Sequence, residues 1–132
     1  MSELTALKIL IVDDFRAMRR IVRVLLKEIG CYSVEEAGDG VAALALLRAQ
    51  PFDVVISDIA MPAMSGLALL AAIKADSALK HLHVLLVTAE ATKDEIVAAV
   101  RSGAAGCVVK PFSRETLETK LAAMFASADA PA

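Results

Sequence analysis

Residues 8–14 read KILIVDD, a short apolar run rich in β-branched residues that ends in two adjacent acids. A run of this length and composition is typical of a buried strand. Similar runs follow at 54–57 (VVIS), 84–87 (VLLV) and 107–109 (CVV), and longer stretches with helical periodicity separate them. Strands that alternate with helices indicate βαβ units. The sequence therefore predicts an α/β fold, in which helices cover both faces of a parallel sheet.

A fifth strand is predicted at 33–37, where SVEEA lacks the continuous apolar character of the other four. Its two acids suit the edge of a sheet, where one face of the strand lies partly in water.

Five helices are predicted, each following a strand. The first is the clearest, because apolar residues from Phe15 to Ile29 recur on one stripe and Gly30 then ends the helix. The other boundaries come from capping residues: Asp39-Gly40 to about Ala49, Ser65 to about Lys74, Thr92 with Glu95 to Ser102-Gly103, and Ser113 before a helix whose Leu117, Leu121 and Met124 face inward.

The length of 132 residues is typical of one domain, and we expect it to span 1–132, with a core at about 7–126 and a short tail at 127–132. The longest uncharged run, Ile59 to Ile73, is interrupted by Pro62 and Gly66, so no membrane segment is expected. The N-terminus lacks the basic start of a signal peptide. These features favour a cytoplasmic protein.

The formal net charge is −2 and the charges are mixed along the chain, which argues against a nucleic-acid partner. Cys31 and Cys107 lie far apart, and His81 and His83 have no nearby partner with metal-ligand spacing. We interpret the cysteines as buried free thiols and the histidines as loop or strand-entry residues, in a reducing compartment.

Chemically reactive side chains follow four of the predicted strands. Asp13 and Asp14 follow the first, Asp58 the third, Thr88 the fourth and Lys110 the fifth. Because parallel strands point the same way, these five side chains should meet at the carboxyl edge of the sheet, where such folds bind ligands.

Three neighbouring carboxylates repel one another unless a cation neutralises them, and Mg²⁺ suits such a site because it binds carboxylate and phosphate oxygens together. Asp58 is the candidate nucleophile, since carboxylates can form aspartyl phosphates. Lys110 would neutralise an incoming phosphoryl group, and the Thr88 hydroxyl would donate to one of its oxygens. Each of these residues alone is more often structural, so the prediction depends on their combination.

Two related chemistries are disfavoured. A nucleotide or flavin site needs a Gly-rich or hydroxyl-rich loop after the first strand, where this chain has DDFRAMRR. Dehalogenase-type phosphatases typically carry a second acid two residues after the nucleophile, where this chain has Ala60. A small aspartate-nucleophile phosphatase remains a remote alternative.

The chain resembles the receiver domains of two-component response regulators, and especially those of chemotaxis, from about Leu7 to Phe125. The resemblance rests on the motifs IVDDF, MRRIVR, VEEA with GDG, VISD followed by MP, G-L-x-LL, VTAEA and VVKPF.

The resemblance implies a five-stranded doubly wound sheet of order 2-1-3-4-5 with five helices. It implies that Asp58 accepts a phosphoryl group from a sensor histidine kinase (CheA-like). One Mg²⁺ would be bound by Asp14, Asp58 and the backbone carbonyl of Ala60, and by Asp13 through water. Thr88 and Lys110 would hold the phosphoryl oxygens, and the Lys110-Pro111 bond would be cis. No enzymatic activity is expected beyond Mg-dependent self-phosphorylation and autodephosphorylation.

The resemblance also implies a monomer that signals by shifting between two states and binding a partner, most simply a flagellar switch protein (FliM-like), with a phosphatase as a further partner. The signalling surface would comprise the fourth helix, fifth strand and fifth helix, including Ala91, Lys93, Cys107, Val109, Phe112 and Lys120. A phosphate sink, or a regulator of a non-flagellar partner, remains the alternative.

Cys107 departs from the family pattern, which has an aromatic residue there. Either the signal is relayed by Thr88 and the loop after it, or the output differs from motor binding. Ala60 and Glu90 fall at positions that tune the phosphoryl lifetime, and the small Ala60 favours a short to moderate one. A row of arginines on the first helix is either a solvated face or a docking patch for a kinase or phosphatase: Arg16, Arg19, Arg20 and Arg23.

Overall fold

The computed structural model of the chain describes residues 2–90 and 92–129. Its strands form a parallel sheet in the order β2-β1-β3-β4-β5, so the predicted topology is confirmed, with β2 at an edge. The strands are β1 (Lys8–Val12), β2 (Ser33–Ala37), β3 (Val54–Asp58), β4 (His83–Thr88) and β5 (Gly106–Val109).

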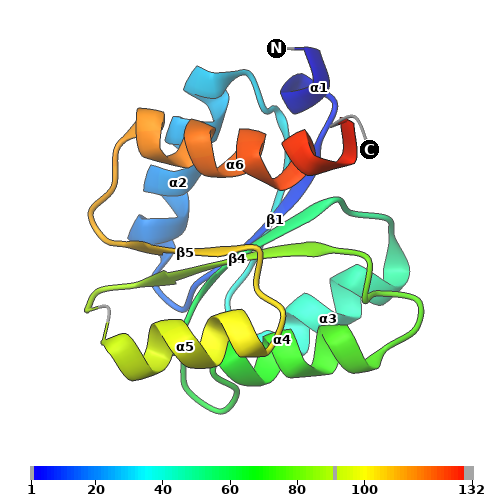
Figure 1. Cartoon of the computed structure of the whole chain (residues 1–132), viewed down its shortest axis with the longest axis vertical. Helices are drawn as coiled ribbons and strands as arrows, with labels where there is room; N and C mark the ends of the chain where they lie inside the picture. Colours follow the sequence, from blue (N-terminus) through cyan, green and yellow to red (C-terminus); the bar gives the residue numbers. More distant parts are fainter. Residues whose placement is uncertain (1, 91, 130–132) are drawn as a thin grey trace.

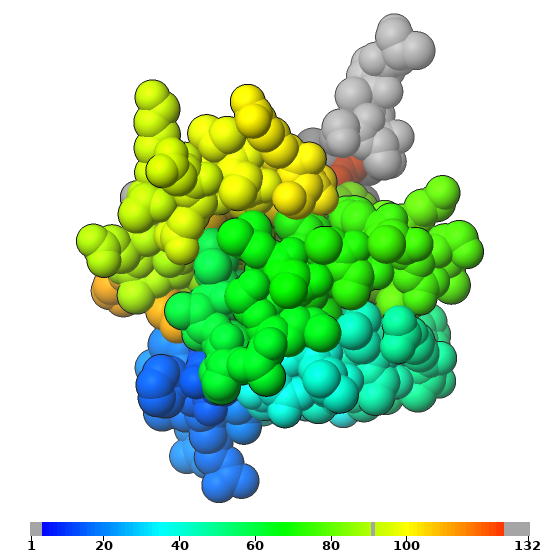
Figure 2. Space-filling view, turned by 90° about the horizontal axis from the view of Figure 1, so that it is seen from below, coloured from blue at the N-terminus to red at the C-terminus, as the bar shows by residue number. Residues whose placement is uncertain are grey.

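The five predicted helices cover both faces of this sheet. On one face lie α2 (Arg16–Ile29) and α6 (Arg114–Asp129), and on the other lie α3 (Gly40–Ala49), α4 (Gly66–Ala75) and α5 (Lys93–Arg101) (Figure 1). Figure 2 shows α3, α4 and α5 side by side across the second face, in cyan, green and yellow.

The core has two layers, one on each side of the sheet. Successive strand residues point to opposite faces, so Ile9 packs with one layer and Leu10 with the other. The layer under α3, α4 and α5 includes Leu10, Val55, Leu69, Leu70, Ile73 and Leu86. The layer under α2 and α6 includes Ile9, Ile11, Leu26, Ile56, Leu85, Leu117 and Leu121.

Four of the helix starts are capped as the sequence predicts. A side-chain oxygen of Asp39, Ser65, Thr92 and Ser113 accepts a hydrogen bond from the backbone N–H three residues later, at 2.7–3.1 Å. Helix α2 differs, because its N-cap Phe15 has no capping side chain. Its N–H donates instead to Asp13 Oδ1 at 2.9 Å, so an acid of the candidate site also orders the start of α2.

The structure corrects the predicted apolar stripe of α2 at its first member. Phe15 is 66% exposed, because it precedes the helix and points away from the core. Val22 and Leu26 are the residues of α2 that are fully buried. Cys31 is a buried free thiol as predicted, whereas Cys107 is only partly buried.

The N-terminus adds an element that periodicity did not predict. A short helix, α1 (Ser2–Thr5), leads into β1, and Leu4 and Leu7 are buried in the α2–α6 layer. The Cys31 thiol donates to the Leu4 carbonyl at 3.2 Å. Packing therefore begins before residue 7, and α6 extends to Asp129, through part of the predicted tail.

Ion pairs connect α2 to the edge strand β2. Glu36 of β2 accepts from Arg19 Nε at 3.0 Å and from Arg23 Nε at 2.7 Å. Burial alone would raise the pKa of Glu36, but the hydrogen bonds and charges of Arg23 and Arg19 outweigh it and lower the pKa.

We therefore expect Glu36→Gln to lower the free energy of unfolding at pH 7 by roughly 0.5–1 kcal/mol, because ionised Glu36 is stabilised only in the folded state. This contribution is present above the unfolded pKa of about 4.3 and is lost as the pH falls through the lower folded value. Urea unfolding between pH 3 and pH 7 measures it, with exposed Glu35→Gln as the control. An equal loss of stability at both pH values would contradict the assignment.

Candidate functional site

Three carboxylates meet at the carboxyl ends of β1 and β3. One oxygen from each of Asp13, Asp14 and Asp58 lies within 4.8 Å of the other two. Asp13 and Asp58 are only 4% and 5% exposed, whereas Asp14 faces solvent. The two strands pair directly, which brings residues 44 or more positions apart in the chain to one edge of the sheet.

Lys110 lies over this cluster from the end of β5. Its ammonium nitrogen is 3.1 Å from Asp58 Oδ1 and 3.3 Å from Asp13 Oδ2. Its backbone N–H donates to the Thr88 carbonyl at 2.8 Å, and the Lys110–Pro111 peptide bond is cis. Four of the five side chains expected at the edge of the sheet therefore contact one another or lie within one cluster.

The electrostatics of the cluster are dominated by burial. Burial raises the pKa of Asp58; the hydrogen bond and charge of Lys110 oppose this, while the negative charges of Asp13 and Asp14 add to it, and the net direction is upward. Burial alone would lower the pKa of Lys110, but Asp58 and Asp13 outweigh it and raise the pKa. Lys110 is therefore charged at neutral pH, and it is one cation beside three carboxyl groups.

Thr88, the fifth predicted residue, is buried at the end of β4 and engaged elsewhere. Its hydroxyl donates to the Glu90 carbonyl and accepts from the Glu90 N–H, both at 3.2 Å. These two bonds occupy the hydroxyl proton and one lone pair. To donate to a group on Asp58, the Thr88 hydroxyl would have to give up its bond to the Glu90 carbonyl.

Gly66 is a residue of the site to which sequence reasoning assigned no role. It begins α4 directly against β3, and its N–H donates to the Ile59 carbonyl at 2.8 Å. A Cβ at this position would lie 2.2 Å from the Asp58 carbonyl oxygen and 2.9 Å from Ile59 Cα. The only signal in the sequence is the glycine itself within the motif G-L-x-LL, because the contact depends on how α4 packs against β3.

The residues of the predicted signalling surface do not all lie on the same side of the sheet. Cys107 packs against the α3–α5 layer, and Val109 is 45% exposed on β5. Phe112 instead packs against the α2–α6 layer, because the chain crosses to that side after Lys110. Lys93 begins α5 and Lys120 lies in α6, while Ala91 lies outside the described residues.

Burial and the charge of Glu95 raise the pKa of the Cys107 thiol against the opposing charge of Lys120. A raised pKa disfavours a reactive thiolate.

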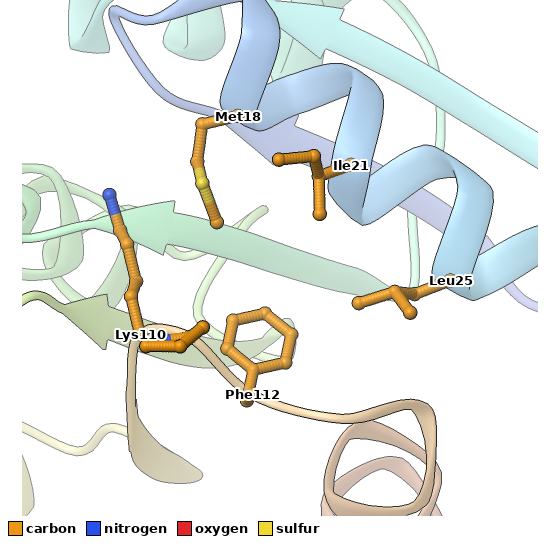
Figure 3. A pocket seen from close by; sticks show the side chains of 6 residues that line it. Met18, Ile21, Leu25, Lys110 and Phe112 are labelled. Carbon is orange, nitrogen blue, oxygen red and sulfur yellow. The ribbon is translucent and has the colours of Figure 1, made fainter.

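Phe112 lines an apolar pocket of about 240 Å³ beside the candidate site. Figure 3 shows its ring facing Met18, Ile21 and Leu25 of α2, with Lys110 at one end of the pocket. Lys110, which bridges Asp13 and Asp58, therefore also lines this pocket.

The four arginines of α2 line a second pocket, of about 330 Å³, together with Glu36. Only two of them, Arg19 and Arg23, form ion pairs there within residues 2–90 and 92–129. Arg16 and Arg20 are exposed.

The fold and this cluster define an α/β domain with an acidic site at the carboxyl edge of its sheet. Residues 9–122 match the family model described as "Response regulator receiver domain", so the chain belongs to that family. Members of this family are signalling proteins.

Two curated relatives come from chemotaxis. The chain is 49% identical to "Chemotaxis protein CheY" of Pseudomonas aeruginosa over 90% of its own length and 96% of the relative's. It is 50% identical to "Chemotaxis protein CheY-3" of Vibrio cholerae, over 90% and 92%. Among solved structures, Vibrio cholerae CheY4 superimposes with a TM-score of 0.81 at 39% identity, covering 87% of this chain and 95% of that one.

In the part of the chain that the structure describes, the helices are too short or too polar to cross a membrane.

We expect Gly66→Ala to lower the free energy of unfolding by about 1–3 kcal/mol, because the new methyl group overlaps the main chain of Asp58 and Ile59 and α4 must shift. Urea denaturation measures the change. Gly38→Ala is the control, since its Cβ would meet no atom closer than 3.7 Å. Equal effects of the two substitutions would contradict the close approach.

Proposed function

We propose that the chain is a stand-alone, single-domain response regulator that accepts a phosphoryl group on Asp58 from the phosphohistidine of a sensor histidine kinase. The observation that carries this proposal is the buried Asp58 carboxylate, held by Lys110 and grouped with two further aspartates. Membership of the receiver family supports it independently.

The donor set of the cluster fits Mg²⁺. Three carboxylates within reach of a common point, only partly neutralised by one lysine, favour a hard divalent cation. Asp14, Asp58 and the backbone carbonyl of Ala60 would hold the ion, with Asp13 acting through water. When bound, Mg²⁺ would offset the repulsion between the carboxylates and bind an oxygen of the incoming phosphoryl group.

In the proposed reaction, a carboxylate oxygen of Asp58 attacks phosphorus and the P–N bond of the phosphohistidine breaks. The bonding electron pair returns to the imidazole nitrogen, which takes up a proton as it leaves. Lys110, already 3.1 Å from Asp58, would stabilise the charge of the phosphoryl oxygens. Attack of water on phosphorus later restores the carboxylate and releases phosphate.

The apolar pocket beside Lys110 supports a place for the phosphodonor to dock. Its side chains come from α2 and the segment after β5, and it adjoins the site that a phosphohistidine must reach. We propose that the kinase domain, CheA-like if the output is chemotaxis, covers this pocket during transfer.

The proposed switch acts through Thr88. A phosphoryl group on Asp58 offers the Thr88 hydroxyl a charged acceptor, which competes with the Glu90 carbonyl that it binds now. Such a change would move the loop after β4 and so the surface around α5, β5 and α6. Because residue 107 is a cysteine and not the aromatic residue of the family pattern, we propose that Thr88 and its loop carry this relay.

We propose chemotaxis as the pathway, because the relatives named above are chemotaxis proteins of similar length. The output partner would be a FliM-like flagellar switch protein in the cytoplasm, with a phosphatase to reset a monomeric regulator.

The lifetime of the phosphoryl group would depend on Ala60 and Glu90. Ala60 is exposed and small, so it leaves water access to the phosphoryl group and favours a short to moderate lifetime. Glu90 would be the second tuning position.

The phosphorylation chemistry is tested by incubating the protein with Mg²⁺ and acetyl phosphate and measuring its intact mass. We expect a gain of one phosphoryl group that is absent in Asp58→Asn and absent when a chelator removes Mg²⁺. Asp94→Asn, an exposed acid at the start of α5, is the matched control and should be phosphorylated normally.

An unchanged mass, or the same gain in Asp58→Asn, would contradict the proposal. Sustained release of phosphate from an external ester would indicate the phosphatase alternative. A phosphorylated protein that gains no binding partner in a pull-down would indicate a phosphate sink.

A further inference from the structure

Arg19 differs from the other arginines of α2 because it contacts the main chain of the acidic site. Its Nη1 donates to the Asp13 carbonyl oxygen at 2.5 Å, and its Nε donates to Glu36 Oε1 at 3.0 Å. Its side chain is only 17% exposed. One guanidinium therefore joins α2 to the carboxyl end of β1 and to β2.

The two acids after β1 are anchored unequally. Asp13 is fixed through its N–H, which donates to the Ala37 carbonyl at 3.2 Å, and through its side chain, which accepts from the Phe15 N–H at 2.9 Å. The Asp14 side chain is exposed, and no hydrogen bond to it occurs within residues 2–90 and 92–129. The direction of the Asp14 carboxylate therefore depends on its backbone.

That backbone is what Arg19 holds. The carbonyl of Asp13 and the amide nitrogen of Asp14 belong to one planar peptide unit. A hydrogen bond that fixes the carbonyl fixes the plane, and with it the starting direction of the Asp14 side chain. Because the donor is a charged guanidinium in a partly buried position, this bond is stronger than one between neutral groups.

Glu36 keeps Arg19 in position. It binds Arg19 and Arg23 through separate carboxylate oxygens, which fixes the plane of the Arg19 fork while Nη1 reaches Asp13. Lysine could not reproduce this arrangement, because its ammonium has no fixed fork. Arg20 is the next residue along α2 but is exposed, so it offers the same charge without the contact.

We propose that Arg19 is a positioning residue for the metal site, which acts by holding the Asp13–Asp14 peptide so that the Asp14 carboxylate faces the cation. This inference rests on the proposed function, because it takes the acidic cluster to bind Mg²⁺. Side chains that orient metal ligands typically change metal affinity by 10–100-fold when they are replaced.

The test is an Mg²⁺ titration followed by the amide NMR shifts of the site. We expect Arg19→Gln to weaken Mg²⁺ binding by about tenfold. Arg20→Gln, with the same loss of charge, and Arg23→Gln, which loses a Glu36 partner but leaves Asp13 alone, should bind like the wild type. The ¹³C shift of the Asp13 carbonyl, which accepts from Arg19, should change in Arg19→Gln and not in Arg20→Gln or Arg23→Gln, before any metal is added.

Equal loss of affinity in Arg19→Gln and Arg20→Gln would overturn the inference in favour of a general disturbance of α2, because the loss of a positive charge by itself strengthens the binding of a cation. Unchanged affinity in Arg19→Gln would overturn it outright. If Arg19→Gln does not fold, Glu36→Ala removes the acceptor of Arg19 Nε while Arg19 keeps its charge. It must then bind Mg²⁺ more weakly than Glu35→Ala, which removes the same charge from an exposed position on β2. A wild-type protein that binds no Mg²⁺ would instead contradict the proposed function.

Discussion

The repulsion among Asp13, Asp14 and Asp58 is the constraint on which the rest of the site depends. Asp13 and Asp58 are almost fully buried, and burial raises the pKa of Asp58 against the opposing charge of Lys110. That charge lies 3.1 Å from Asp58 and 3.3 Å from Asp13. One lysine faces three acids, and this is why we propose that the site binds a divalent cation and a phosphoryl group together. In this proposal, the repulsion between the carboxylates, which would destabilise the cluster by itself, is what favours the binding of a cation.

The parallel sheet allows these acids to lie close together at the ends of two well-packed strands. The central strands β1 and β3 are apolar on both faces and are held by two core layers, so they can carry charged groups at their ends without losing packing. Neighbouring contacts then fix the main chain around the acids. Gly66 allows α4 to approach Asp58 closely, and the N–H of Phe15 binds Asp13. Glu36 of the edge strand β2 accepts a hydrogen bond from Arg19, so this strand also helps to hold Arg19 in place.

Most of the fold could be predicted from local signals. Apolar runs placed the strands, and Asp39, Ser65 and Thr92 marked helix starts, because periodicity and capping act within a few residues. Five chemically reactive residues were expected at one edge because parallel strands share a direction. Four form the cluster, whereas the Thr88 hydroxyl is bound to Glu90, a detail that depends on the loop after β4.

What the sequence could not provide was long-range packing. Phe15 lies on the predicted stripe yet is exposed, and Phe112 packs towards α2 while Cys107 packs on the other side of the sheet. Leu4 is buried although its segment is too short for a periodic pattern. The contact of Gly66 with Asp58 and that of Arg19 with Asp13 join residues from different elements, and no local pattern marks either.

The central claim is that unbalanced negative charge in the acidic cluster makes the folded protein a specific Mg²⁺ site. The most direct measurement is the free energy of unfolding as a function of Mg²⁺ concentration, at constant ionic strength. A ligand that binds only the native state stabilises it by RT ln(1 + [L]/Kd), so stability should rise with Mg²⁺ along the curve for a single site. Stability that does not change with Mg²⁺ would contradict the account.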